Sequence, residues 1–220
     1  MCDALAVGEE HAPPECFYPK RLRTNLIKVP ACAAHNYANH LDVDYVRNVL
    51  SVQRGSNAVA EEVFDTAKRS LDHSPKLRSR TLHGAREVVV DGEKTGALRI
   101  DLARHKRVMS AIAYALFYRD HGRKHLGSWR VFTPTFAYAP TIDRGHVDPW
   151  KNFRHLLESG RYTAMPVPHP EVFEYEALEM EESQTMFRFT FYGSTAVNVW
   201  THFNTFVHWT NPWLIIGDTA

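Results

Sequence analysis

The sequence predicts an α+β fold, and two observations support this class. Apolar residues recur at helical spacing in several stretches, whereas other short stretches are rich in the aromatic and β-branched residues that are typical of strands. The chain has 220 residues, of which 44% are hydrophobic and 23% are charged. It is therefore long enough to bury one sizeable core or two small ones, and nothing in it indicates disorder or a fibrous structure.

The first fifty residues predict two strands followed by a helix. An apolar run from Leu26 to Val29 comes after a turn region that contains Pro13, Pro14 and Pro19, and together they indicate a loose β-hairpin. After Pro30 the spacing becomes helical. The residues that line one face of this helix are Leu41, Tyr45, Val46, Val49 and Leu50. The predicted order is ββα.

Helices and strands also alternate in the remainder of the chain. Helices are predicted over Asn57 to Leu71, Ala103 to Tyr118 and Trp150 to Leu157. Pro75 interrupts the first of them, and Gly122 stops the second. Strands are predicted over Arg86 to Val90, Ala97 to Leu102, Val172 to Glu179, Phe187 to Tyr192 and Ala196 to Trp200. The first two of these flank a turn with two glycines and form a hairpin.

A polar break from Ser51 to Ser56 is the one natural boundary in the sequence. We expect an N-terminal module over residues 1–52 and a larger α+β body over residues 53–220. The chain has no uncharged apolar run long enough to span a bilayer and no N-terminal signal pattern, so we expect a cytoplasmic protein that does not bind membranes.

The N-terminal module contains a spaced set of residues suited to metal-assisted hydrolysis. It includes Glu10-His11, then Asn25, then Cys32-Ala33-Ala34-His35-Asn36, and finally His40. In an extended segment, Glu10 and His11 point to opposite faces, one toward a metal and the other toward an attacking water. On one helix, Asn36 and His40 lie on the same face. Glu10, Asn36 and His40 together are therefore expected to chelate one divalent ion.

This set of residues resembles the motif of the HNH, or ββα-metal, endonucleases. The resemblance covers only about the first fifty residues. It implies that His11 is the general base, that Glu10 and Asn36 are metal ligands, and that Asn25 orients the catalytic loop. Asn36 stands where the family's final His would be, so this is an H-N-N variant. An amide oxygen ligates hard cations, and the implied metal is Mg²⁺ or Mn²⁺.

A structural zinc site is also implied by the resemblance, and it is incomplete in this sequence. Cys2, Cys32 and His35 are the expected ligands, but tetrahedral zinc takes four. Either the zinc has been lost, or the true start codon lies upstream. Cys16 lies between two proline-containing segments and is expected to be a small buried thiol instead of the missing ligand.

The formal net charge is only +1, but positive charge is clustered in the sequence. The clusters lie at 20–23, 76–80, 104–107 and 119–124. They are either a phosphate-binding face for nucleic acid, with DNA favoured over RNA, or ordinary solvated helix ends. The aromatic residues between Trp200 and Trp213 are expected in the core, or in a contact with a second copy or a partner protein.

The function that these features favour is a metal-dependent endonuclease that hydrolyses phosphodiester bonds. Similar modules occur in host-defence nucleases, mobile-element enzymes and toxins. The alternative is a catalytically inactive, HNH-derived zinc-knuckle module that binds nucleic acid or protein. A third class, an interaction protein without any nucleic-acid role, fits the near-zero net charge.

Overall fold

A computed structural model describes residues 4–37, 40–53, 56–90, 93–133, 162–180 and 184–201. The helices are α1 (Ala33–Tyr37), α2 (His40–Ser51), α3 (Ala58–His73), α4 (Pro75–Thr81) and α5 (Leu102–His121), and two short 3₁₀ helices are η1 (Glu15–Phe17) and η2 (Lys20–Leu22). The strands are β1 (Gly8–His11), β2 (Lys28–Ala31), β3 (Arg86–Val90), β4 (Glu93–Ala97), β5 (Trp129–Phe132), β6 (Thr163–Met165), β7 (Phe173–Met180), β8 (Gln184–Phe191) and β9 (Thr195–Thr201). The predicted α+β class is confirmed.

Five strands form the largest sheet, in the order β5-β9-β8-β7-β6, and every neighbouring pair is antiparallel. Because side chains alternate between the faces of a sheet, the cross-strand register brings the aromatic residues to one face. Large buried residues on that face include Phe173, Tyr175, Phe187, Phe189, Phe191, Val197 and Val199. The three strands predicted in the C-terminal half are confirmed as β7, β8 and β9, with small shifts at their ends.

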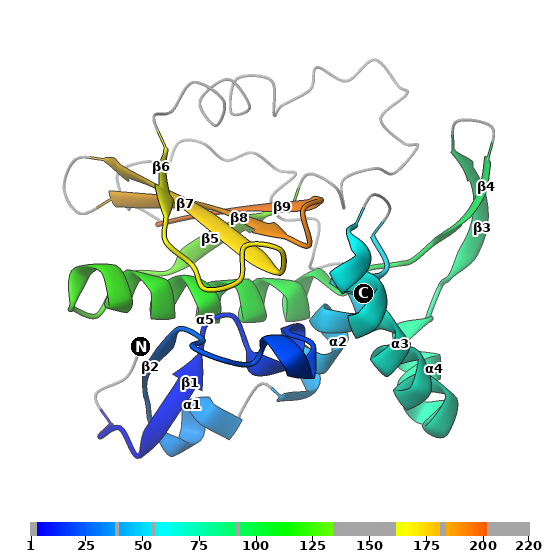
Figure 1. The fold of residues 1–220 in the computed structure, drawn as a ribbon, viewed down its shortest axis with the longest axis horizontal. Helices are drawn as coiled ribbons and strands as arrows, with labels where there is room; N and C mark the ends of the chain where they lie inside the picture. The colour runs from blue at the N-terminus through cyan, green and yellow to red at the C-terminus, as the bar shows by residue number, and fades with distance from the viewer. Residues whose placement is uncertain are drawn as a thin grey trace.

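The long helix α5 runs along the sheet in Figure 1 and contacts β5 and β9. Asp101 caps its start, because the Asp101 carboxylate accepts a hydrogen bond from the Arg104 N–H at 3.1 Å. Gly122 ends it with φ 65°, in the left-handed conformation that favours glycine. The helix also contacts α2 and β2, which explains why its apolar stripe is broad. The predicted core helix and its stop at Gly122 are confirmed.

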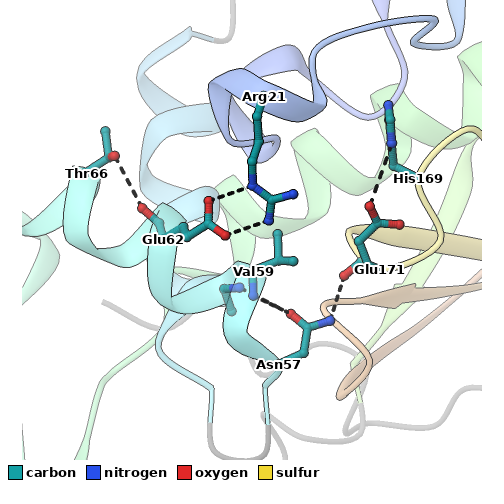
Figure 2. Close-up of polar contacts among 8 residues, drawn as sticks. Arg21, Asn57, Val59, Glu62, Thr66, His169 and Glu171 are labelled. Atoms are coloured by element: carbon teal, nitrogen blue, oxygen red, sulfur yellow. Dashed lines mark hydrogen bonds and ion pairs between the residues drawn. The ribbon is translucent and has the colours of Figure 1, made fainter.

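Asn57 starts α3 and connects it to the sheet. Its Oδ1 accepts hydrogen bonds from the N–H of Val59 at 3.1 Å and of Ala60 at 3.2 Å, which is a regular N-cap. Its Nδ2 donates to the Glu171 carbonyl at 2.7 Å, just before β7 (Figure 2). The helix predicted over Asn57 to Leu71 is therefore confirmed. Pro75 interrupts it as expected, but Pro75 also opens α4, since proline is well tolerated in the first turn of a helix.

The N-terminal residues pack into the same core as the rest of the described chain. β1 and β2 form an antiparallel pair, and α1 lies against β1. Ala12, Phe17, Tyr18, Leu26 and Val29 belong to one hydrophobic cluster that also includes α2, α5 and the large sheet. The Tyr192 hydroxyl donates a hydrogen bond to the Phe17 carbonyl at 2.9 Å. Residues on both sides of position 52 thus share one core, and the domain boundary at that position stays a prediction.

The structure differs from the sequence-based prediction in several elements. The prediction of a second hairpin strand over Ala97 to Leu102 is wrong. The strand that pairs with β3 is β4, which begins at Glu93, opposite Val90. In the sequence, Asp91 and Gly92 lie between the two strands. β5 and β6 were not expected. The helix predicted over residues 150–157 and the aromatic residues beyond 201 lie outside the described residues. None of the described helices is long and apolar enough to cross a lipid bilayer.

Candidate functional site

Glu10 and His11 lie next to each other on β1, opposite Val29 and Lys28 of β2. The Glu10 side chain is half-buried, and this burial raises the pKa of its carboxyl above the ordinary value. Among the described residues, no cation lies within salt-bridge distance of Glu10, whereas Glu9 pairs with the Lys28 Nζ at 3.2 Å. A half-buried carboxylate without a protein cation beside it is a group that a bound metal ion would stabilise.

Cys32 and His35 come together at the start of α1. The Cys32 Sγ lies 3.1 Å from the His35 Nδ1, and Cys32 is buried. In a tetrahedral zinc site with ordinary bond lengths, a sulfur and a nitrogen ligand would be about 3.5 Å apart. The pair therefore has nearly the separation of two zinc ligands, although here it is a direct sulfur–nitrogen contact. The C-x-x-H spacing accordingly brings its two side chains together.

Other predicted ligands fall partly outside the described structure. Cys2 lies outside the described residues, and Asn36 is described only as part of the α1 backbone. Asn36 belongs to α1 and His40 opens α2, with residues 38–39 outside the description, so the shared helix face stays a prediction. Among the described residues, no three His, Cys, Asp or Glu side chains are grouped so that they could hold a metal. A Mg²⁺ site made of a carboxylate, an amide and waters needs no such group.

Asn25 has a backbone conformation that explains its residue type without any catalytic role. It is exposed, lies between η2 and β2, and has φ 56°. Asn is one of the few residues other than glycine that adopt this left-handed region at low cost. The structure thus adds a local reason for asparagine at this position, while its predicted orienting role stays a prediction.

The structure separates the basic clusters of the sequence into paired and unpaired ones. Most arginines of three clusters are held by carboxylates. These pairs are Arg21–Glu62, Arg23–Glu15, Arg104–Asp42, Arg107–Asp42 and Arg119–Asp120. Arg104 and Arg107 both pair with Asp42, and Arg107 is the closer of the two, with its Nε 2.7 Å from the Asp42 Oδ2. The pairs of Arg21, Arg104 and Arg107 join separate elements, and the sequence does not predict them because their partners lie far away along the chain, whereas Asp120 directly follows Arg119 in α5.

Cys16 lies in η1, where the sequence predicts a small buried thiol. Its side chain is largely enclosed, and this burial raises the pKa of the thiol to about 11. A thiol with this pKa is protonated at neutral pH, whereas zinc binds the thiolate. This environment favours the structural interpretation of Cys16.

Comparison of this chain with protein-family models, with curated proteins and with solved structures finds no match in any of the three.

Proposed function

We propose that this protein is a metal-dependent endonuclease of the HNH type, with His11 as general base and Glu10 and Asn36 as metal ligands. The observation that carries the proposal is the motif itself together with the elements that bear it. Glu10 and His11 share β1, and α1, which bears His35 and Asn36, lies against that strand. A nucleic-acid substrate, DNA in preference to RNA, and a cytoplasmic location are parts of the proposal.

The donor set fits a hard divalent cation. Glu10 supplies a half-buried carboxylate whose raised pKa reflects a desolvated charge. Asn36 supplies an amide oxygen, and Mg²⁺ or Mn²⁺ would complete its coordination with waters and substrate phosphate oxygens. When bound, the ion would neutralise charge on the phosphate and on the leaving oxygen.

His11 would carry the proton transfer of the reaction. The attacking water loses a proton to a ring nitrogen of His11 while its oxygen forms the new bond to phosphorus. The phosphorus–oxygen bond on the opposite side breaks, and the leaving oxygen takes a proton from solvent. His11 is only partly buried at the end of β1, so part of this residue is open to water.

Plasmid nicking by the full chain, with Mg²⁺ or Mn²⁺ and with EDTA, tests this function. His11→Ala should lower the nicking rate by about two to four orders of magnitude, which is the usual contribution of a general base. His73→Ala, which removes an exposed histidine of α3, is the matched control and should nick like wild type. Nicking that survives EDTA, or a folded His11→Ala variant with unchanged rate, would contradict the proposal.

A second function is favoured by the contact between Cys32 and His35. A Sγ–Nδ1 distance of 3.1 Å is close to the separation in a zinc knuckle, and such a module binds nucleic acid or protein without cutting. Under this alternative, the protein binds duplex DNA with equal affinity in the presence and absence of Mg²⁺ and shows no metal-dependent nicking.

A further inference from the structure

Positive charge on the side of the molecule formed by α4 and the base of the β3–β4 hairpin has no ion-pair partner among the described acidic residues. Between Asp72 and Glu87 the sequence has four Lys or Arg residues and no acidic residue. Lys76, Arg78 and Arg86 are exposed, and none of them has an ion pair among the described residues. This distinguishes the segment from the other basic clusters, whose arginines are mostly held by carboxylates.

The fold brings a further cation, Arg99, from the residues that follow β4 to this segment. Gly84 has φ 70°, and a Cβ placed on it would lie 3.1 Å from the Cβ and 3.6 Å from the Cδ of Arg99. The stem of the Arg99 side chain therefore lies across Gly84, between the end of α4 and the start of β3. Arg99 is also exposed and has no ion pair among the described residues. Two parts of the chain fifteen positions apart thus contribute to one basic surface.

The hairpin itself extends away from the rest of the described protein (Figure 1). β3 and β4 form a sheet of only two strands, and the Val89 side chain is 65% exposed. A two-stranded hairpin in water is only marginally stable, so contact with a partner would stabilise the β3–β4 hairpin. Glu87 pairs with the Lys94 Nζ at 3.0 Å, and Glu93 opens β4 at the far end of the hairpin, so the positive surface is confined to the base of the hairpin.

We propose that α4 and the base of the β3–β4 hairpin form a phosphate-contacting surface for double-stranded DNA. We call this surface, made of Lys76, Arg78, Arg86 and Arg99, the basic arm. Its charge complements the phosphate backbone, and its lack of partner acids leaves the cations available to displace condensed counterions. The choice of DNA as the occupant rests on the proposed endonuclease function. The basic arm would hold the duplex by its backbone without reading its sequence.

Fluorescence anisotropy with a labelled 24-base-pair duplex, measured in EDTA at several salt concentrations, tests the basic arm. The test variant is Arg78→Gln/Arg86→Gln/Arg99→Gln in the full chain. Three lost phosphate contacts should reduce the slope of log K against log salt by about 2.7 and weaken binding by two to three orders of magnitude near 0.1 M salt. All three positions are exposed, so the variant should fold like wild type, which circular dichroism and thermal melting check.

The matched control removes the same number of charges at exposed positions elsewhere, as Lys20→Gln/Lys106→Gln/Arg123→Gln. The proposal is supported if only the basic-arm variant loses affinity and salt slope. It is overturned if both triple variants lose affinity equally, if the slope is unchanged, or if the wild-type chain does not bind the duplex at all. Because EDTA prevents metal-dependent cutting, this result does not depend on whether His11→Ala abolishes nicking. Failure of the basic-arm proposal can therefore be told apart from failure of the proposed nuclease function.

Discussion

Asn57 is the residue whose replacement tests the architecture most directly, because one side chain serves two elements. Its Oδ1 caps α3 through the N–H of Val59 and Ala60, and its Nδ2 donates to the Glu171 carbonyl at 2.7 Å (Figure 2). Removing the cap costs about 1 kcal/mol, and leaving the partly buried Glu171 carbonyl without its donor costs about another 1 kcal/mol. Asn57→Ala should therefore lower the free energy of unfolding by about 2 kcal/mol.

Asn57→Ser separates the two contributions. Serine caps helices about as well as asparagine, but its hydroxyl is too short to reach the carbonyl that Nδ2 now meets. This variant should lose only about 1 kcal/mol. In urea unfolding followed by circular dichroism, with a slope of about 2 kcal/mol per molar, the midpoints should shift by about 1 M for alanine and about 0.5 M for serine.

The reasoning about Asn57 would be refuted by a particular pattern of midpoints. If the urea midpoint of Asn57→Ala lies within about 0.2 M of the wild-type midpoint and the slope is unchanged, neither the helix cap nor the hydrogen bond to the Glu171 carbonyl stabilises the fold. If serine costs as much as alanine, the cap contributes nothing and the whole effect comes from the bond to the Glu171 carbonyl.

Three further predictions follow from local features of the structure. Burial lowers the pKa of His105 to about 3, so the unfolded chain binds a proton below about pH 6.5 that the folded chain does not, and stability falls as pH drops from there toward 3. Between pH 6.5 and pH 5, wild type should lose roughly 2 kcal/mol more than His105→Gln, and equal losses in urea titrations would contradict this. Asn25→Gly should retain stability because glycine accepts φ 56°, whereas Asn25→Ala should lose about 1 kcal/mol; loss of nicking in the stable glycine variant would support the orienting role, and full nicking would contradict it. The 220-residue chain should retain less than one zinc per molecule after dialysis, and elemental analysis that finds one zinc, lost in Cys32→Ser, would show that the zinc site is complete.

The elements that the sequence predicted well are those in which local signals and periodicity agree. In α5, the apolar stripe is bounded by Gly122, and glycine is the usual residue for a left-handed helix end. The aromatic and β-branched runs of β7, β8 and β9 predict strands because such residues pack well on a pleated surface. Their alternation then determines which side chains enter the core.

Short elements were harder to predict. β5 and β6 have only four and three residues, too few to show alternation, and they form because β9 and β7 offer free edges to pair with. The sequence pattern places the second hairpin strand too late, because the glycine at position 96 resembles a turn residue, although Gly96 lies inside β4. Asp101, assigned to that strand, instead caps α5.

By itself, the sequence determined the α+β class, the long helix, the main strands and the C-x-x-H spacing that brings Cys32 and His35 together. These depend on residues close together in the chain, whose types and spacing carry the information. Only the tertiary structure decided which charges are neutralised. Asp42 reaches Arg107 across 65 positions, while Arg99 comes to lie beside Gly84 without an acidic partner among the described residues. Charge pairing of this kind depends on how elements pack, because salt bridges form between side chains that are neighbours in space and not in sequence.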